Sequence, residues 1–175
     1  MKSRMKNPVL IIPEAMQAMY ALNTVVDKSG LPRELVWLVQ LRASQINGCA
    51  VCLDMHARIM QHGGETDERI NAVAAWHDAP YYTDAERAAL ALTEALTRMA
   101  DRTDPIPDEV WQPAARQFNE VELSGLILAV SVICADTAHR PDWEWLKWLP
   151  HALHPTRTDA LGQLRLISES VTGLA

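Results

Sequence analysis

The 175-residue chain has little of what a β-sheet protein or a membrane-spanning protein requires. Phe occurs once and Gly seven times, whereas Ala, Leu, Val and Met are abundant, and this mixture favours helices over strands. No apolar run approaches the length needed to span a bilayer. Strand-like alternation, repeats and low-complexity linkers are also missing. The sequence therefore predicts a single all-α domain covering residues 1–175.

Basic residues are also scarce relative to acidic ones, with 16 Lys and Arg against 22 Asp and Glu and a net charge of −6. This balance argues against nucleic acid and acidic membrane surfaces as partners. The N-terminal stretch lacks the long apolar segment and small-residue cleavage site of a signal peptide, so we expect a cytoplasmic protein. Three cysteines in a reducing compartment do not form a structural framework, and a close pair favours catalysis or metal binding.

Prolines, glycines and capping residues divide the chain into helices. Pro113 should shorten or kink its helix, or lie in the first turn. The tryptophans Trp143, Trp145 and Trp148 should pack onto the bundle or onto a neighbouring subunit. The expected helices run over about 13–30, 32–47, 49–61, 66–79 and 83–100, then from about 107, from 119 in a helix apolar nearly all round, and over 161–168.

The stretch NGCAVCLDMH carries the residues with the clearest chemistry. Cys49, Cys52 and His56 are spaced i, i+3 and i+7, which places them within roughly 60° of one helix face. If Asn47 caps this helix, Cys49 lies in the first turn, where the helix dipole favours a thiolate. Two thiols at this spacing can close a disulfide, and a neighbouring histidine can accept a thiol proton.

Other roles for these residues stay open at this point. They could be small buried residues of a helical core, or metal ligands, although zinc would require a fourth ligand that no second CxxC provides. His62 is better explained as the end of a helix, and Asp54 as a solvated side chain. Cys134 lies in the most apolar helix, which favours a buried inert thiol over a third redox partner.

The longer stretch LVQLRASQINGCAVCLDMHARIMQHGGETDERINAVAAWHDAPYYTDAERAALALTEALT, residues 38–97, resembles the carboxymuconolactone decarboxylase family, specifically its AhpD-like alkylhydroperoxidase branch. The resemblance implies an AhpD-like helical bundle that forms a dimer, trimer or hexamer. It implies reduction of a hydroperoxide substrate, with Cys52 as the attacking thiol, Cys49 as the resolving thiol and His56 in a proton relay. An unidentified dithiol reductant would restore the pair, and no metal, flavin or nucleotide cofactor is required.

One position departs from the family pattern. A relay glutamate usually stands twelve residues before the first cysteine, where this chain has Trp37. Glu34, one turn earlier, could reach the site through water or face solvent, and Trp37 could cover the thiols or pack elsewhere. Loss of the carboxylate would weaken general base assistance. The alternatives are therefore a dithiol–disulfide oxidoreductase with little peroxidase activity and a non-enzymatic helical ligand-binding protein.

Overall fold

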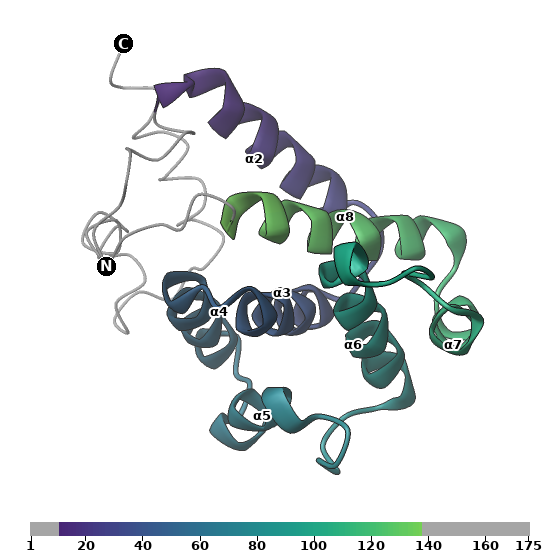
Figure 1. The fold of residues 1–175 in the computed structure, drawn as a ribbon. Coiled ribbons are helices and arrows are strands. Elements are labelled where there is room, and N and C mark those ends of the chain that lie inside the picture. The colour runs from purple at the N-terminus through teal and green to yellow at the C-terminus, as the bar shows by residue number, and fades with distance from the viewer. Residues whose placement is uncertain (1–10, 138–175) are drawn as a thin grey trace.

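The structure, a computed structural model, describes residues 11–137, and this part of the chain is an all-α fold (Figure 1). Within it, no strand occurs, and no helix is long and apolar enough to cross a membrane. The predicted fold class is confirmed. The α-helices are α2 (Pro13–Asp27), α3 (Arg33–Asn47), α4 (Ala50–His62), α5 (Asp67–Ala72), α6 (Asp84–Thr97), α7 (Asp108–Gln117) and α8 (Glu120–Thr137), with 3-10 helices η1 (Val73–Ala75) and η2 (Met99–Asp101).

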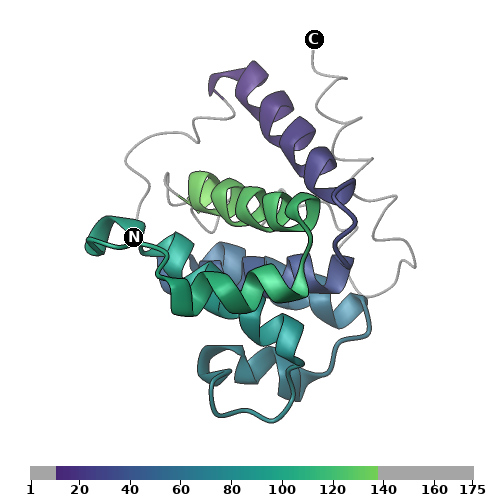
Figure 2. The ribbon, with the colours of Figure 1, turned by 90° about the vertical axis from the view of Figure 1, so that its right-hand side faces the viewer.

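Helix α3 lies at the centre of the bundle. It packs against α4, α6 and α8, and its buried face includes Leu38, Val39 and Leu41. Leu90 of α6 and Leu126 of α8 are also fully buried in the same hydrophobic core. In two perpendicular views, α8 lies between α2 and the rest of the bundle (Figures 1 and 2). Helix α8 is thus covered on opposite sides, which explains why its sequence is apolar nearly all round.

Three helix starts follow the capping signals in the sequence. The Thr66 hydroxyl accepts the N–H of Arg69 at the start of α5. Thr83 and Glu86 form a complete capping box before α6, in which each side chain bonds the backbone of the other. Asn119 and Glu122 make the same reciprocal contacts before α8. The structure confirms these three starts. The helices begin there because each cap satisfies N–H groups that the first helical turn leaves unpaired.

Three predicted helix ends are wrong. Helix α2 ends at Asp27, three residues before the expected end at 30. The helix expected to run to Pro80 ends at Ala72 and continues only as η1. The Arg87 guanidinium donates to carbonyls of the following segment, at 3.1 Å for Trp76 and 3.2 Å for His77, and thereby stabilises a turn. Helix α6 stops at Thr97, because the backbone of Arg98 leaves the helical region at φ −114°.

Pro113 lies inside α7, which begins at Asp108 with Pro107 as its N-cap, so the alternative of a position in the first turn is wrong. The predicted helix over 161–168 and the Trp143–Trp148 segment lie outside the described residues. That residues 1–175 form a single domain stays a prediction.

An ion pair connects the central helix to α6. The Glu94 carboxylate accepts hydrogen bonds from Arg42 Nε at 2.9 Å and Arg42 Nη2 at 2.8 Å. The same oxygen accepts the indole N–H of Trp76 at 2.8 Å. Arg42 also donates to the Gln45 side chain at 2.9 Å. This network fixes the half of α3 that leads into the cysteine motif.

Candidate active site

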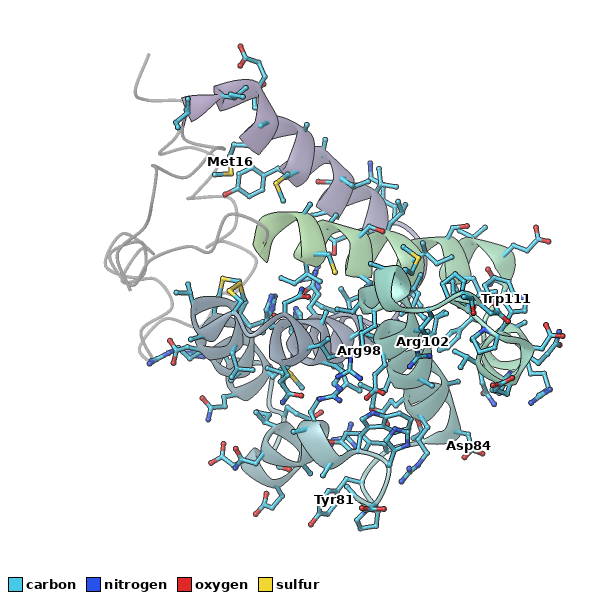
Figure 3. All side chains as sticks on the ribbon, in the orientation of Figure 1. Met16, Tyr81, Asp84, Arg98, Arg102 and Trp111 are labelled. Atoms are coloured by element: carbon cyan, nitrogen blue, oxygen red, sulfur yellow. A yellow bond between two sulfur atoms is a disulfide. The ribbon has the colours of Figure 1, made fainter. Side chains whose placement is uncertain are left out.

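The two cysteines of the motif meet at the start of α4. Cys49 and Cys52 form a disulfide, with their Cα atoms 5.4 Å apart (Figure 3). Cys49 is the N-cap of α4, and its sulfur accepts the backbone N–H of Cys52 at 3.3 Å. The structure therefore brings the predicted redox pair together at a helix N-terminus, where unpaired N–H groups favour negative charge on sulfur.

The expected role of Asn47 as the cap is wrong. Asn47 is the last residue of α3, and Gly48 ends that helix with a left-handed φ of +65°. The Cys49 N–H then returns to the Ser44 carbonyl at 3.1 Å. Because a glycine is needed for this conformation, Gly48 turns the chain sharply and makes Cys49, two residues after the expected cap, the N-cap of α4.

The two sulfurs differ in their surroundings. Cys52 is only 2% exposed and packs with Ala43 of α3 and Ile133 of α8. Cys49 is half-buried at the edge of this small cluster. A large reagent approaching the disulfide from solvent therefore meets the Cys49 side of the bond first.

His56 lies one helical turn after Cys52 and is buried, at 5% exposure. Neither ring nitrogen has a hydrogen-bond partner among the described residues. Burial lowers the pKa of His56 from 6.5 to about 4, because the charged imidazolium loses its hydration. The imidazole is therefore neutral at pH 7, with one nitrogen able to accept a proton.

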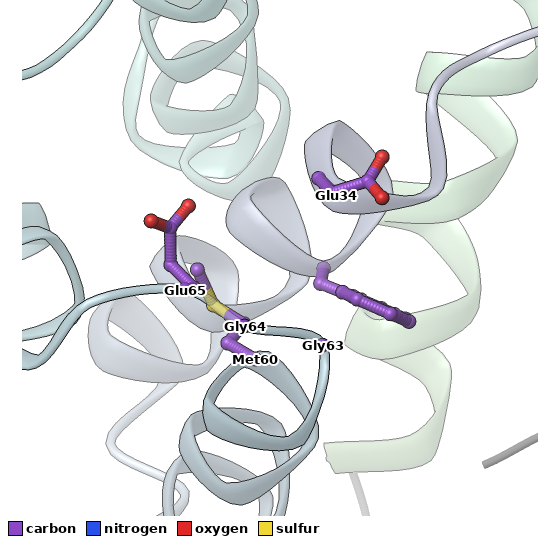
Figure 4. A pocket seen from close by; sticks show the side chains of 6 residues that line it. Glu34, Met60, Gly63, Gly64 and Glu65 are labelled. Carbon is purple, nitrogen blue, oxygen red and sulfur yellow. The ribbon is translucent and has the colours of Figure 1, made fainter. Parts of the chain in front are cut away.

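Trp37 and Glu34 lie away from the cysteines. Trp37 packs against Gly63, and both line a hollow of about 230 Å³ with Glu34, Met60 and Glu65 (Figure 4). Met60 lies in the last turn of α4 and residues 63–65 directly follow it, at the end opposite to Cys49, and a helix of this length extends about 20 Å. Glu34 is exposed. In this conformation Trp37 does not cover the thiols, and Glu34 does not replace the relay glutamate.

Cys134 is predicted from the sequence to be a buried thiol, and the structure shows it only half-buried. The Asn47 side-chain amide donates to its sulfur at 3.6 Å, which places Cys134 beside the turn that leads from α3 to the Cys49–Cys52 disulfide. No pattern in the sequence predicts this contact, because the two residues belong to different helices and lie 87 positions apart.

The remaining candidates occupy surface positions. Asp54 forms an ion pair with Arg58 at 2.9 Å on the outer face of α4, as expected for a solvated side chain. His62 is the last residue of α4, and its Nδ1 lies 2.7 Å from the Arg58 carbonyl oxygen. Between residues 11 and 137, no three His, Cys, Asp or Glu side chains gather in a way that could hold a metal ion.

Fold and site together define an all-α protein with a disulfide-forming CxxC motif at a helix N-terminus. Residues 13–95 match the carboxymuconolactone decarboxylase family. The chain is 33% identical over 123 residues to the uncharacterized protein YdfG of Bacillus subtilis, an alignment that covers 70% of this chain and 82% of YdfG. The chain belongs to the carboxymuconolactone decarboxylase family.

Solved structures agree with this assignment. Protein ATU0492 of Agrobacterium tumefaciens, of unknown function and provisionally assigned to antioxidant defence as AhpD, superposes with a TM-score of 0.70. It is 36% identical, over 77% of this chain and 90% of its own. The debrominase Bmp8 in complex with 2,3,4-tribromopyrrole has a TM-score of 0.62 at 20% identity, over 91% of this chain and 78% of its own. That likeness concerns the fold alone.

A shorter likeness concerns a different kind of protein. A stretch of 42 residues is 52% identical to the ESX secretion system protein EccC of Thermomonospora curvata. It covers 24% of this chain and 3% of EccC, which is too little of that protein to carry an argument on function.

Proposed function

We propose that this protein is a thiol-dependent hydroperoxide reductase. The observation that carries the proposal is the Cys49–Cys52 disulfide at the start of α4, with the buried imidazole of His56 one turn further on. A pair that closes a disulfide in the folded protein can take two electrons from a dithiol and give them to an oxidant.

In the proposed cycle, the Cys52 thiolate attacks the distal oxygen of a hydroperoxide. The O–O bond breaks, the leaving alkoxide takes a proton, and Cys52 becomes a sulfenic acid. The Cys49 thiol then attacks the Cys52 sulfur, releasing water and forming the disulfide. A dithiol reductant restores both thiols by two exchange steps. Burial of Cys52 favours a small hydroperoxide, because only a small oxidant can reach that sulfur.

His56 is proposed to accept the Cys52 thiol proton and to return it to the leaving group. With a pKa near 4, His56 is a weak acceptor for a thiol proton. No carboxylate assists it, because Trp37 replaces the family's glutamate and Glu34 lines the hollow at the other end of α4. This favours a slow peroxidase. The same observation supports the second candidate, a dithiol–disulfide oxidoreductase, since thiol exchange at the half-buried Cys49 needs no peroxide-activating base.

We also propose that the protein is a cytoplasmic homo-oligomer. Exposed apolar side chains on and beside α2, such as Ile12 at 54% and Val25 at 52%, support association with a second copy. A reducing compartment would supply the dithiol that the cycle requires.

The test is thiol counting with intact mass after mixing fully reduced protein with one equivalent of an organic hydroperoxide. The expected result is rapid loss of two thiols, mapped by peptides to Cys49 and Cys52. The Cys134→Ala variant is the matched control and should lose the same two. Survival of all three thiols in the wild type would overturn the peroxidase proposal and favour the ligand-binding alternative.

A further inference from the structure

The imidazole of His56 is buried without a hydrogen-bond partner, and this destabilises the folded protein. Its Nδ1 and Nε2 are the buried side-chain nitrogens without a hydrogen-bond partner among the described residues. Other buried polar side chains of this region are paired; Ser44, for example, donates to the Gln40 carbonyl at 2.8 Å. A buried polar group without a partner raises the free energy of the state in which it occurs.

The state that carries this unpaired group is the oxidised one. Cys52 precedes His56 by four residues on α4, so their side chains are neighbours on one helix face. In the disulfide the Cys52 sulfur is bonded to Cys49 and has no proton to donate. Reduction breaks the S–S bond, adds two electrons and two protons, and leaves Cys52 with an S–H that can donate to the imidazole. In the reduced form the Cys52 S–H is therefore a hydrogen-bond partner for His56, and in the oxidised form this partner is absent.

We propose that His56 sets the reduction potential of the Cys49–Cys52 pair by stabilising its reduced form. The hydrogen bond lowers the free energy of the dithiol, and the unpaired imidazole raises the free energy of the disulfide. Both effects make the potential less negative, so that the disulfide is more easily reduced. The inference rests on the proposed function only in that the pair cycles between its two states, and it gives His56 a thermodynamic role beside its proposed role as proton acceptor.

The test replaces His56 with an apolar residue and measures the potential, not the turnover. The protein is equilibrated with dithiothreitol buffers of known ratio, and the fraction of disulfide is read by mass after acid quenching. For His56→Leu the equilibrium should shift about tenfold toward the disulfide, which is about 30 mV more negative. Met60→Leu, buried one turn further along α4, is the matched control and should leave the potential unchanged. An unchanged or less negative potential for His56→Leu would overturn the proposal.

A second measurement uses the wild type and so does not depend on a variant that folds. With ¹⁵N-labelled histidine, reduction should move the ring nitrogen resonances of His56 in the direction of a new hydrogen bond. Identical resonances in both redox states would refute the proposed pairing. Neither measurement uses a hydroperoxide. A protein inert to peroxide that still shows these shifts would lose its proposed peroxidase function and keep this inference.

Discussion

Trp37 lies so close to Gly63 that a Cβ atom added at Gly63 would fall 2.3 Å from Cζ3 of the indole. The position where the family usually has a relay glutamate is thus occupied by a ring that fixes α3 against the C-terminal end of α4. Gly63 has an ordinary helical φ of −73°, so the contact with Trp37, and not the backbone conformation, requires a glycine there.

We therefore predict that Gly63→Ala destabilises the protein by about 1 to 3 kcal/mol through overpacking. Urea unfolding of Gly63→Ala, of Trp37→Ala and of the double variant Gly63→Ala/Trp37→Ala would measure the change in unfolding free energy. In the double variant the added methyl group meets empty space, so its cost should largely disappear. Strictly additive free energies would contradict the proposed contact.

Glu94 is predicted to stabilise the fold through its bonds to Arg42 and Trp76. Burial by itself would raise the pKa of Glu94, but the hydrogen bonds from Trp76 and Arg42 hold it below its usual value. Glu94→Gln leaves the largely buried guanidinium of Arg42 without its counter-charge, which should cost about 2 to 3 kcal/mol in urea unfolding at pH 7.

The exposed Asp54–Arg58 pair provides the control, since Asp54→Asn should change the unfolding free energy by about 0.5 kcal/mol or less. Because the folded pKa of Glu94 is lowered, its contribution is present above the unfolded pKa and is lost as the pH falls. Equal costs for the two substitutions would show that Glu94 is not a structural anchor.

His56 should make the protein sensitive to mild acid. Its pKa is about 4 in the folded state and 6.5 in the unfolded state, so below pH 6.5 the unfolded state binds the proton first. The free energy of unfolding should fall by roughly 3 kcal/mol between pH 6.5 and about pH 4. Below about pH 4, His56 should cause no further loss.

Comparing His56→Leu with the wild type from pH 7 to pH 4 isolates this effect from that of the carboxylates. The difference in unfolding free energy between the two proteins should change with pH over this window only. Parallel curves would mean that the imidazole titrates normally in the folded protein.

External thiols should attack the disulfide mainly at the Cys49 sulfur. Cys49 is half-buried and Cys52 is 2% exposed, so an attacking thiolate reaches Cys49 more easily. When oxidised Cys134→Ala protein is treated with excess glutathione and quenched with an alkylating reagent, peptide mapping should place glutathione on Cys49. The alkyl group should be on Cys52, with a preference of about tenfold, which corresponds to about 1.4 kcal/mol between the two attacks. The reverse labelling pattern would contradict the accessibility argument.

The sequence predicts well those parts of the fold that depend on local signals. The capping box at Thr83 and Glu86 involves neighbours along the chain and is confirmed. The closeness of Cys49 and Cys52, three positions apart, is confirmed as well. The early end of α5 depends on Arg87 reaching back to several carbonyls, a contact that periodicity does not reveal. The Asn47–Cys134 contact and the fit of Trp37 on Gly63 need the packed bundle as well.

The burial of the site residues does not follow from the motif. The motif places His56 on the same face as the cysteines, but it does not show that the imidazole lacks a partner. It also does not show that α8 closes over Cys52 while leaving Cys49 partly accessible. These differences arise from helices that are distant in the sequence, and they determine how the two sulfurs can be reached.

The cap of α4 is itself a reactive atom. Most helices begin on an oxygen that takes no part in chemistry, whereas here the acceptor for the Cys52 N–H is the Cys49 sulfur. A reagent that consumes this sulfur also removes the anchor of the first helical turn. Covalent labelling of Cys49 would therefore also fray the backbone at Ala50 and Val51. A thiol probe at this site would perturb the segment that it reports on.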